Sequence, residues 1–270
     1  MKIKKVLTVM AISLLILIAL LLILFGVLKV IGNGNNKKID DLVNKGLEQV
    51  KAEYTVTQLD AGEYTDMRFY GIMNFHVDQY DIEELGNLSV MTADMGFMQM
   101  VSFMITPFEK NVPLCTLDFM YIMGNRKSYV EFYDLAADTQ SEDYVELQGE
   151  LMKMTSRWSD IEEIPSEPQW YDEYLKVVMH KQLDKDIDEE RNLELFADAL
   201  GTYLTETKQV EMNSAELQEQ QTANIKLYTN GLIEKGGVST DVFKKALGEE
   251  KTADFFDKVF FGTALSETSK

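Results

Sequence analysis

The sequence predicts an α+β protein, with a central antiparallel β-sheet flanked by helices, behind an N-terminal transmembrane helix. Three observations lead to this prediction. Residues 67–133 contain runs of apolar and aromatic residues joined by short connections, which favour antiparallel pairing. Beyond Leu135 the apolar residues take helical spacing, and strands followed by helices are typical of α+β domains. The stretch from Val6 to Leu28 contains no charged residue.

That uncharged stretch is long enough to cross a membrane as one helix. The helix would be about 34 Å long, against a hydrocarbon core of about 30 Å. A cleaved signal peptide would have a shorter apolar region followed by a small-residue cleavage site, which this segment lacks. Cys115 is the only cysteine, so an N-terminal lipid-modified cysteine is excluded. We therefore expect an uncleaved anchor over residues 1–31 that contacts the membrane through residues 6–28.

Lysines on both sides of this stretch bear on its orientation. Three lysines among the first five residues favour a cytoplasmic N-terminus, whereas Lys29, Lys37 and Lys38 favour the opposite. We expect a single-pass membrane protein whose globular domain lies on the extracytoplasmic side.

Residues 32–38 are rich in glycine and asparagine and are predicted to form a flexible linker. Residues 39–270 form the predicted globular domain, which begins with a helix near 39–50. We expect strands near 67–77, 88–94, 97–106, 114–123 and 128–133, with a hairpin loop at 124–127. We expect further helices near 142–158, 170–182, 189–207, 215–234, 240–247 and 251–260.

Composition excludes several classes of function. The formal net charge is −19, and nucleic-acid binding requires clustered lysine and arginine, so we expect no nucleic-acid partner. The sequence contains no Gly-rich phosphate loop and no G-x-S-x-G, C-x-x-C or H-E-x-x-H pattern. The two histidines, His76 and His180, are far apart in sequence, so we expect no metal site.

Five methionines crowd one short stretch: Met91, Met95, Met98, Met100 and Met104. Clustered thioethers can hold Cu(I), but these spacings mix the two faces of a strand and suit no single coordination geometry. Methionine also fills irregular cores and adaptable apolar pockets, which is the interpretation we favour.

Asp118 is the most informative charge in the predicted sheet. Side chains alternate between the two faces of a strand, so Asp118 shares a face with Leu114, Thr116, Met120 and Ile122. A carboxylate on an apolar face has a raised pKa and can act as a proton donor. A structural hydrogen bond to a neighbouring loop or helix would explain the same residue, and the pattern alone leaves both explanations open.

Several motifs follow one another in a recognisable order. They are the loop and strand Thr106-Pro107-Phe108 through Val112-Pro113-Leu114-Cys115-Thr116-Leu117-Asp118, the strand Tyr129-Val130-Glu131-Phe132-Tyr133-Asp134-Leu135, Glu167-Pro168-Gln169-Trp170, Glu189-Glu190-Arg191, Leu247-Gly248-Glu249-Glu250, Phe255-Phe256 and Val259-Phe260-Phe261. On these motifs the sequence from about Tyr64 to Gly262 resembles the ferredoxin-dependent bilin reductase superfamily. Enzymes of that superfamily reduce biliverdin and related open-chain tetrapyrroles.

The resemblance implies an α/β/α sandwich that holds a bilin between the sheet and the C-terminal helices. Asp118 stands where the family has its central proton-donating aspartate, which makes it the candidate catalytic residue. The candidate ligand-binding residues, which include the nearest cations, are Ser102, Met104, Met120, Arg126, Lys127 and Lys235. We expect no tightly bound cofactor, with a bilin as the candidate ligand.

Other positions depart from the family's pattern. The histidine or asparagine near the aspartate falls at Val101, beside Ser102, and a catalytic glutamate falls at Ser89. A second aspartate falls near Gly237, and an arginine that pairs with a propionate falls close to Pro165. The resemblance implies ferredoxin docking through a basic surface, and the acidity of this chain argues against a ferredoxin partner.

Two functions are consistent with these observations. One is a membrane-anchored domain that binds an open-chain tetrapyrrole or a similar flat apolar ligand, with its reduction by an external electron donor left open. The other is a non-catalytic cell-surface interaction or structural module that reuses the fold. An apolar cavity beside Asp118 would favour the first, and a space filled by methionine and aromatic side chains would favour the second.

Overall fold

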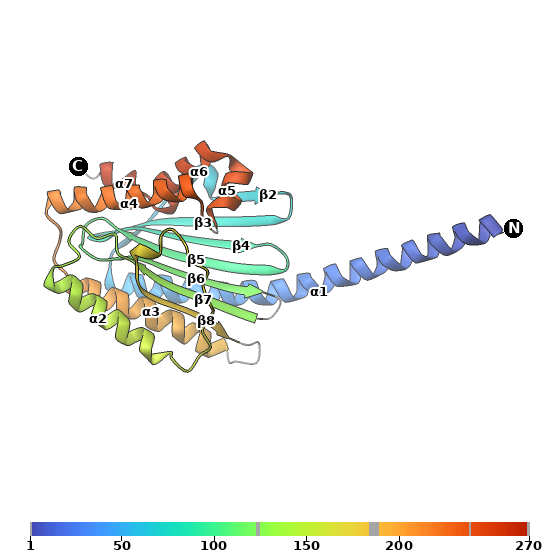
Figure 1. Cartoon of the computed structure of the whole chain (residues 1–270), viewed down its shortest axis with the longest axis horizontal. Coiled ribbons are helices and arrows are strands. Elements are labelled where there is room, and N and C mark those ends of the chain that lie inside the picture. The colour runs from blue at the N-terminus through green and yellow to red at the C-terminus, as the bar shows by residue number, and fades with distance from the viewer. Residues whose placement is uncertain (1, 123–124, 184–188, 238, 269–270) are drawn as a thin grey trace.

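The structure, a computed structural model, describes residues 2–122, 125–183, 189–237 and 239–268. Within the first thirty residues, the described side chains are those of residues 17, 20, 26, 27, 29 and 30. A β-sheet lies between two layers of helices, and one long helix extends away from the body (Figure 1).

The sheet is antiparallel throughout its described strands, as the short connections predict. Its strand order is β1-β3-β4-β5-β6-β7-β8, and β2 pairs with β3 off this path. The strands are β1 (Val56–Leu59), β2 (Asp66–Phe69), β3 (Met73–Ile82), β4 (Gly86–Asp94), β5 (Met98–Pro107), β6 (Leu114–Ile122), β7 (Asn125–Tyr133) and β8 (Leu175–Leu183).

Helices cover both faces of the sheet (Figure 1). On one face lie α1 (Lys2–Glu53), α2 (Glu142–Arg157) and α3 (Glu189–Gln209). On the other lie α4 (Ala215–Lys235), α5 (Thr240–Leu247), α6 (Glu249–Phe255) and α7 (Leu265–Thr268). A π-helical turn, Phe256–Phe260, follows α6, and 3-10 turns occur at Gly62–Tyr64 and Asp172–Tyr174.

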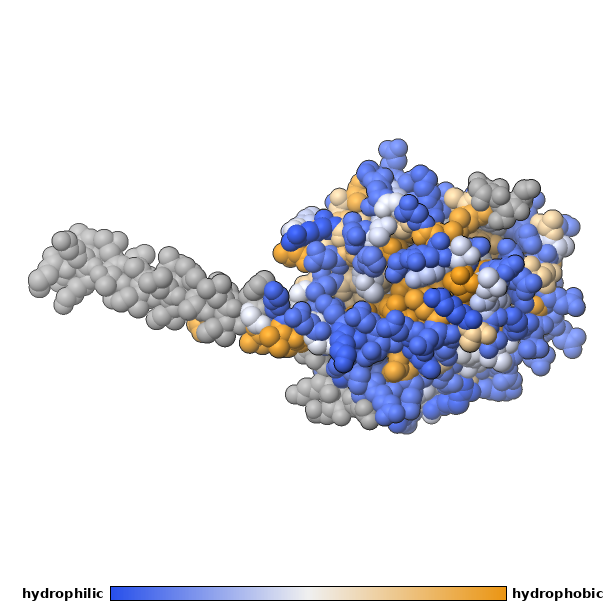
Figure 2. All heavy atoms as spheres, turned by 180° about the vertical axis from the view of Figure 1, so that it is seen from behind, coloured by the Kyte–Doolittle hydropathy of each residue, from blue (hydrophilic) through white to orange (hydrophobic). Residues whose placement is uncertain are grey.

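Alternation along the strands produces two hydrophobic cores, one on each face of the sheet. On β6, Cys115, Leu117 and Phe119 belong to the core beneath α1, α2 and α3. Leu114 and Met120 belong to the core beneath the C-terminal helices, and Asp118 shares their strand phase. Seen from behind, the body has hydrophobic side chains gathered in its middle and hydrophilic residues around them (Figure 2).

The helix α1 passes without a break through residues 32–38, which we expected to be a flexible linker. Asn35 is buried and donates a hydrogen bond of 2.9 Å to the side chain of Gln99. Asn36 donates a bond of 3.1 Å to Asp94. Further along, Gly46 lies so close to the sheet that an added Cβ would sit 2.7 Å from the Phe103 ring. This part of α1 is therefore packed into the domain.

The structure contradicts the predicted membrane span. Within the described part of the chain, no helix combines the length and the apolar composition that crossing a membrane requires. The helix that contains residues 6–28 continues to Glu53, and its C-terminal part carries charged residues and packs on β5 and α3. The predictions of a transmembrane anchor and of a single-pass membrane location are therefore corrected. Most side chains of residues 6–28 lie outside those described.

The main error in secondary structure is at residues 170–182, where we expected a helix. The chain forms the strand β8 there and pairs with β7. Val177 and Met179 are buried while Lys176 and Val178 are exposed, which is the alternation of a strand. The short β1 was missed as well. The strands predicted over 67–133 are confirmed, with the first divided into β2 and β3, and residues 123–124 lie outside those described.

Candidate functional site

A cavity of about 640 Å³ lies between the sheet and the C-terminal helices, on the face that carries Asp118. Strands β5, β6 and β7 contribute Ser102, Thr116 and Tyr129 to one wall, and α4 contributes Tyr228 to the opposite wall. Pockets for small molecules usually measure about 300–1,000 Å³ and are mostly apolar. The cavity is therefore large enough for a ligand of ordinary drug or cofactor size.

The apolar part of the wall is largely methionine and phenylalanine. Met91, Met100 and Met104 line the cavity from β4 and β5, which agrees with the interpretation of the methionine cluster as pocket lining. Phe256 and Phe260 line it from the π-helical turn. Methionine side chains are flexible and polarisable, so these walls can adapt to a flat ligand.

Asp118 lies at the centre of the sheet wall. Its strand neighbours place it opposite Ser102 on β5 and Tyr129 on β7. The side chain keeps some accessible surface only because it faces the cavity, and its Oδ1 atom is buried with no hydrogen-bond partner among the described residues. Burial raises the pKa of Asp118 to about 7, although a hydrogen bond from Ser102 favours the ionised form.

Beside Asp118 the sheet carries a second set of polar groups. His180 on β8 places Nε2 2.7 Å from Oε1 of Glu131 on β7. The Tyr133 hydroxyl donates a 2.6 Å hydrogen bond to the other oxygen of Glu131. Glu131 also adds to the rise of the Asp118 pKa, and His180 opposes that rise. Asp118, Glu131 and His180 therefore form one electrostatically coupled group on the cavity wall.

Tyr133 links this group to the opposite wall. Its ring centroid lies 5.1 Å from that of Tyr228 on α4. Both tyrosines are buried, and burial raises the pKa of each well above its usual value. Both hydroxyls therefore stay protonated at physiological pH and can serve as hydrogen-bond donors.

The predicted ligand-binding residues divide into two groups. Ser102, Met104 and Met120 line the cavity. The three predicted cations do not line it. Arg126 points to the opposite face of the sheet, where its guanidinium lies 2.5 Å from a carboxylate oxygen of Glu189. Lys127 lies on the cavity face of β7 but is not among the lining residues. The ammonium group of Lys235 lies 4.5 Å from the ring centroid of Trp170. The sequence analysis placed Arg126 in a hairpin loop at 124–127, but β7 begins at Asn125 and its alternation turns Arg126 to the other face.

The structure also shows the surroundings of the residues at which the sequence departs from the bilin reductase pattern. Ser89 donates a 2.8 Å hydrogen bond to the backbone oxygen of Phe260 and so ties β4 to the π-helical turn. Val101 is buried in the core on the other face, so Ser102 occupies the cavity side at that level. Pro165 and Gly237 both line the cavity, and neither carries a charge.

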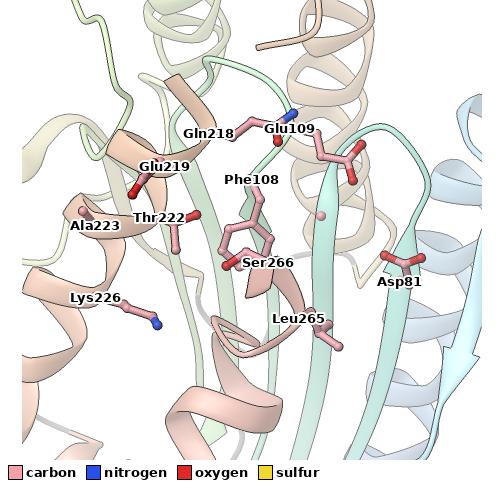
Figure 3. A pocket seen from close by; sticks show the side chains of 11 residues that line it. Asp81, Phe108, Glu109, Gln218, Glu219, Thr222, Ala223, Lys226, Leu265 and Ser266 are labelled. Carbon is pink, nitrogen blue, oxygen red and sulfur yellow. The ribbon is translucent and has the colours of Figure 1, made fainter. Parts of the chain in front are cut away.

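A second hollow of about 240 Å³ lies between the C-terminal helices and the start of β4 (Figure 3). Asp81, Glu109 and Glu219 surround Phe108 there, together with Lys226. Burial raises the pKa of Glu109 and of Asp81, and the neighbouring carboxylates raise both further. Its small size and charged lining make it less suited to a flat apolar ligand than the larger cavity.

Sequence reasoning missed Glu131, His180 and the tyrosines around them. His180 was assigned to a helix, so its position opposite Tyr129 on the neighbouring strand was hidden. Glu131 lay within a correctly predicted strand, and its phase with Tyr129 and Tyr133 was the signal that could have found it.

Comparisons with known proteins establish the fold. The sequence matches no known protein-family profile and no curated protein. Among solved structures, the chain is similar to phytochromobilin synthase from tomato in complex with biliverdin, with a TM-score of 0.70. The similarity covers 84% of this chain and 83% of the tomato chain, at 14% sequence identity. Identity this low supports the fold alone, because one fold hosts many functions. The chain therefore has a bilin-reductase-like α+β fold.

Proposed function

We propose that this protein binds a flat, largely apolar ligand, with an open-chain tetrapyrrole as the first candidate class. The observation that supports this proposal is the cavity of about 640 Å³ between the sheet and the C-terminal helices, with Asp118 on its wall. The tomato protein of similar fold was crystallised with biliverdin, which makes biliverdin the natural first probe.

Asp118 is the group that would exchange a proton with the bound ligand. Its pKa of about 7 means that both protonation states are populated near neutral pH. Asp118 lines the cavity, and its Oδ1 atom is buried without a hydrogen-bond partner among the described residues. Reduction would also require electrons from an external donor, so binding is the part of the function that this chain's own residues support.

The alternative, a non-catalytic interaction module, predicts a filled interior. Methionine and aromatic side chains do gather on this face, but they surround an open cavity. This observation favours ligand binding over the alternative.

Absorbance titration of the purified full-length chain with biliverdin tests the proposal. We expect saturable binding, and Thr116→Phe should weaken it at least tenfold because the new ring fills the cavity beside Asp118. Thr222→Phe, which makes the same change at the second hollow, is the matched control and should leave binding unchanged. Circular dichroism melts verify that both variants fold. Absence of binding, or equal effects of the two variants, would contradict the proposal.

A further inference from the structure

The charged side chains that line the large cavity are almost all acidic. Among the described residues that form its wall, these are Asp118, Glu131, Glu167 and Asp172, with His180 beside Glu131. None of these described lining residues is lysine or arginine. Ligands with carboxylates are normally held by arginine or lysine, so the chemistry of this wall points elsewhere.

The wall also contains buried oxygen atoms whose hydrogen-bonding capacity is unused. Oδ1 of Asp118 and Oγ1 of Thr116 are buried and have no hydrogen-bond partner among the described residues. Both residues line the cavity, and Thr116 is only 9% exposed. A buried polar atom without a partner costs free energy, which a complementary ligand group can recover. For a carboxylate oxygen that complementary group is an N–H or O–H donor.

The basic groups nearest the cavity either contact other residues or, like Lys127 on the same face of β7, lie outside the lining. His180 places Nε2 2.7 Å from the carboxylate of Glu131. Arg126 contacts Glu189 on the opposite face of the sheet, and Lys235 packs on Trp170. A ligand that entered the cavity with its own carboxylates would therefore meet like charge.

We infer that the cavity selects a flat ligand that is neutral or cationic and that presents a hydrogen-bond donor to Asp118, and that it discriminates against ligands carrying carboxylates. This inference rests on the proposed function and narrows its substrate class. Like charges brought together in a poorly hydrated site repel strongly, whereas a donor opposite Asp118 fills an unused acceptor. The discrimination is set by the wall itself, because the selecting groups lie on β6 and β7.

The first experiment compares biliverdin with its dimethyl ester on the full-length chain at pH 8, where Asp118 is mostly ionised. The ester has the same ring system without the two carboxylates, and we expect it to bind at least tenfold more tightly. Glu131→Gln should reduce this ratio at least threefold by removing one wall charge. Glu216→Gln, an exposed change on α4 with the same change in net charge, should leave the ratio unchanged. Equal or tighter binding of biliverdin itself would overturn the inference.

A second experiment separates this inference from the tetrapyrrole proposal. Two flat dyes of opposite charge, cationic thioflavin T and anionic anilinonaphthalene sulfonate, are titrated against the wild type and Thr116→Phe. We expect the cation to bind at least tenfold more tightly and to lose that binding in Thr116→Phe. If it does so while neither bilin binds, charge selection stands and the tetrapyrrole proposal fails. A preference for the anion at the Thr116-dependent site, or binding of neither dye, would overturn the charge selection even if biliverdin binds.

Discussion

The Asp118 side chain lines the cavity, so its protonation should affect the absorbance of a ligand bound there. Its pKa of about 7 places the change in charge near neutral pH. We expect the absorbance of bound biliverdin to change between pH 6 and pH 8 in the wild type. Asp118→Asn keeps the shape and removes the titration, so this change should disappear while the affinity at pH 6 stays within about threefold. A pH-dependent spectrum that persists in Asp118→Asn would assign the titration to another group.

The same carboxyl group should lower the stability of the folded protein at high pH. Its pKa rises from 3.8 when exposed to about 7 in the fold, so between these values the folded state binds more protons than the unfolded state. The free energy of unfolding therefore falls as the pH rises through this range. At pH 8 Asp118→Asn should be more stable than the wild type by up to about 4 kcal/mol, less where cavity water screens the charge.

Urea unfolding of both proteins at pH 8 and at pH 4 measures this effect. At pH 4 the difference should shrink to less than about 1 kcal/mol, because Asp118 is protonated in the fold and is close to its exposed pKa of 3.8 in the unfolded chain. An equal difference at both pH values would show that a lost contact, and not ionisation, is responsible.

At the scale of elements, Glu189 joins three parts of the fold. It begins α3 and accepts hydrogen bonds from Tyr121 on β6 at 2.5 Å and from Arg126 on β7 at 2.7 Å. Lys38 of α1 contacts it at 3.0 Å. Burial alone would raise the pKa of Glu189, but these hydrogen bonds outweigh it and lower the pKa.

Glu189→Ala should therefore destabilise the protein. Removing one partner of a buried ion pair costs about 3–5 kcal/mol, and we expect about 2–3 kcal/mol here because the Glu189 side chain is 32% exposed. Glu194→Ala, at an exposed position of the same helix, is the control and should change the free energy of unfolding by less than about 0.5 kcal/mol. Chemical denaturation measures the free energy of unfolding of both variants. Equal losses of stability would show that the contacts of Glu189 do not hold these elements together.

The strands that could be predicted from the sequence are those whose own residues carry the pattern. Residues 97–106 and 114–123 alternate or are apolar throughout, because both faces of these strands are covered by helices. The strand β8 was missed because a lysine, Lys181, occupies one of its buried positions and interrupts the apolar alternation. Lys181 is tolerated there because it donates hydrogen bonds to the Ile161 carbonyl and to Glu163, both from a segment far away in the chain.

The candidate site was predictable to the extent that it depends on strand phase. Counting alternate residues could place Asp118 with Met120 on one strand and Ser102 with Met104 on another. The resemblance implied that both pairs face the same cavity. Glu131 and His180 could not be brought together, because their contact depends on the register between β7 and β8. The direction of the Arg126 side chain could not be predicted either, because the residue was expected in a hairpin loop and lies instead in β7.

For the whole molecule, we expect ligand binding without efficient reduction. Ser89, Val101 and Gly237 stand where the resemblance expects further proton-handling groups, and none can titrate near neutral pH. The chain also carries a formal net charge of −19, which repels an acidic electron carrier. Anaerobic incubation of the biliverdin complex with reduced ferredoxin should leave the bilin spectrum unchanged over the time in which a bilin reductase from the same assay completes turnover. Formation of a reduced bilin would contradict this expectation and would show that Asp118 and its neighbours suffice for proton delivery during reduction.

The unbroken course of α1 has a geometric consequence for how the domain is presented. A helix of 52 residues is about 78 Å long, and each residue turns it by about 100°. Because its C-terminal part is fixed to the sheet through Asn35, Asn36 and the close approach at Gly46, the helix and the body turn as one piece. Inserting a single alanine into the projecting half would rotate the cavity by about 100° around the helix axis, somewhat more than a quarter of a turn, while four would leave it only about 40° from its original direction. The number of residues in the projecting half of α1 therefore sets the direction in which the cavity faces, relative to the N-terminal turns of the helix.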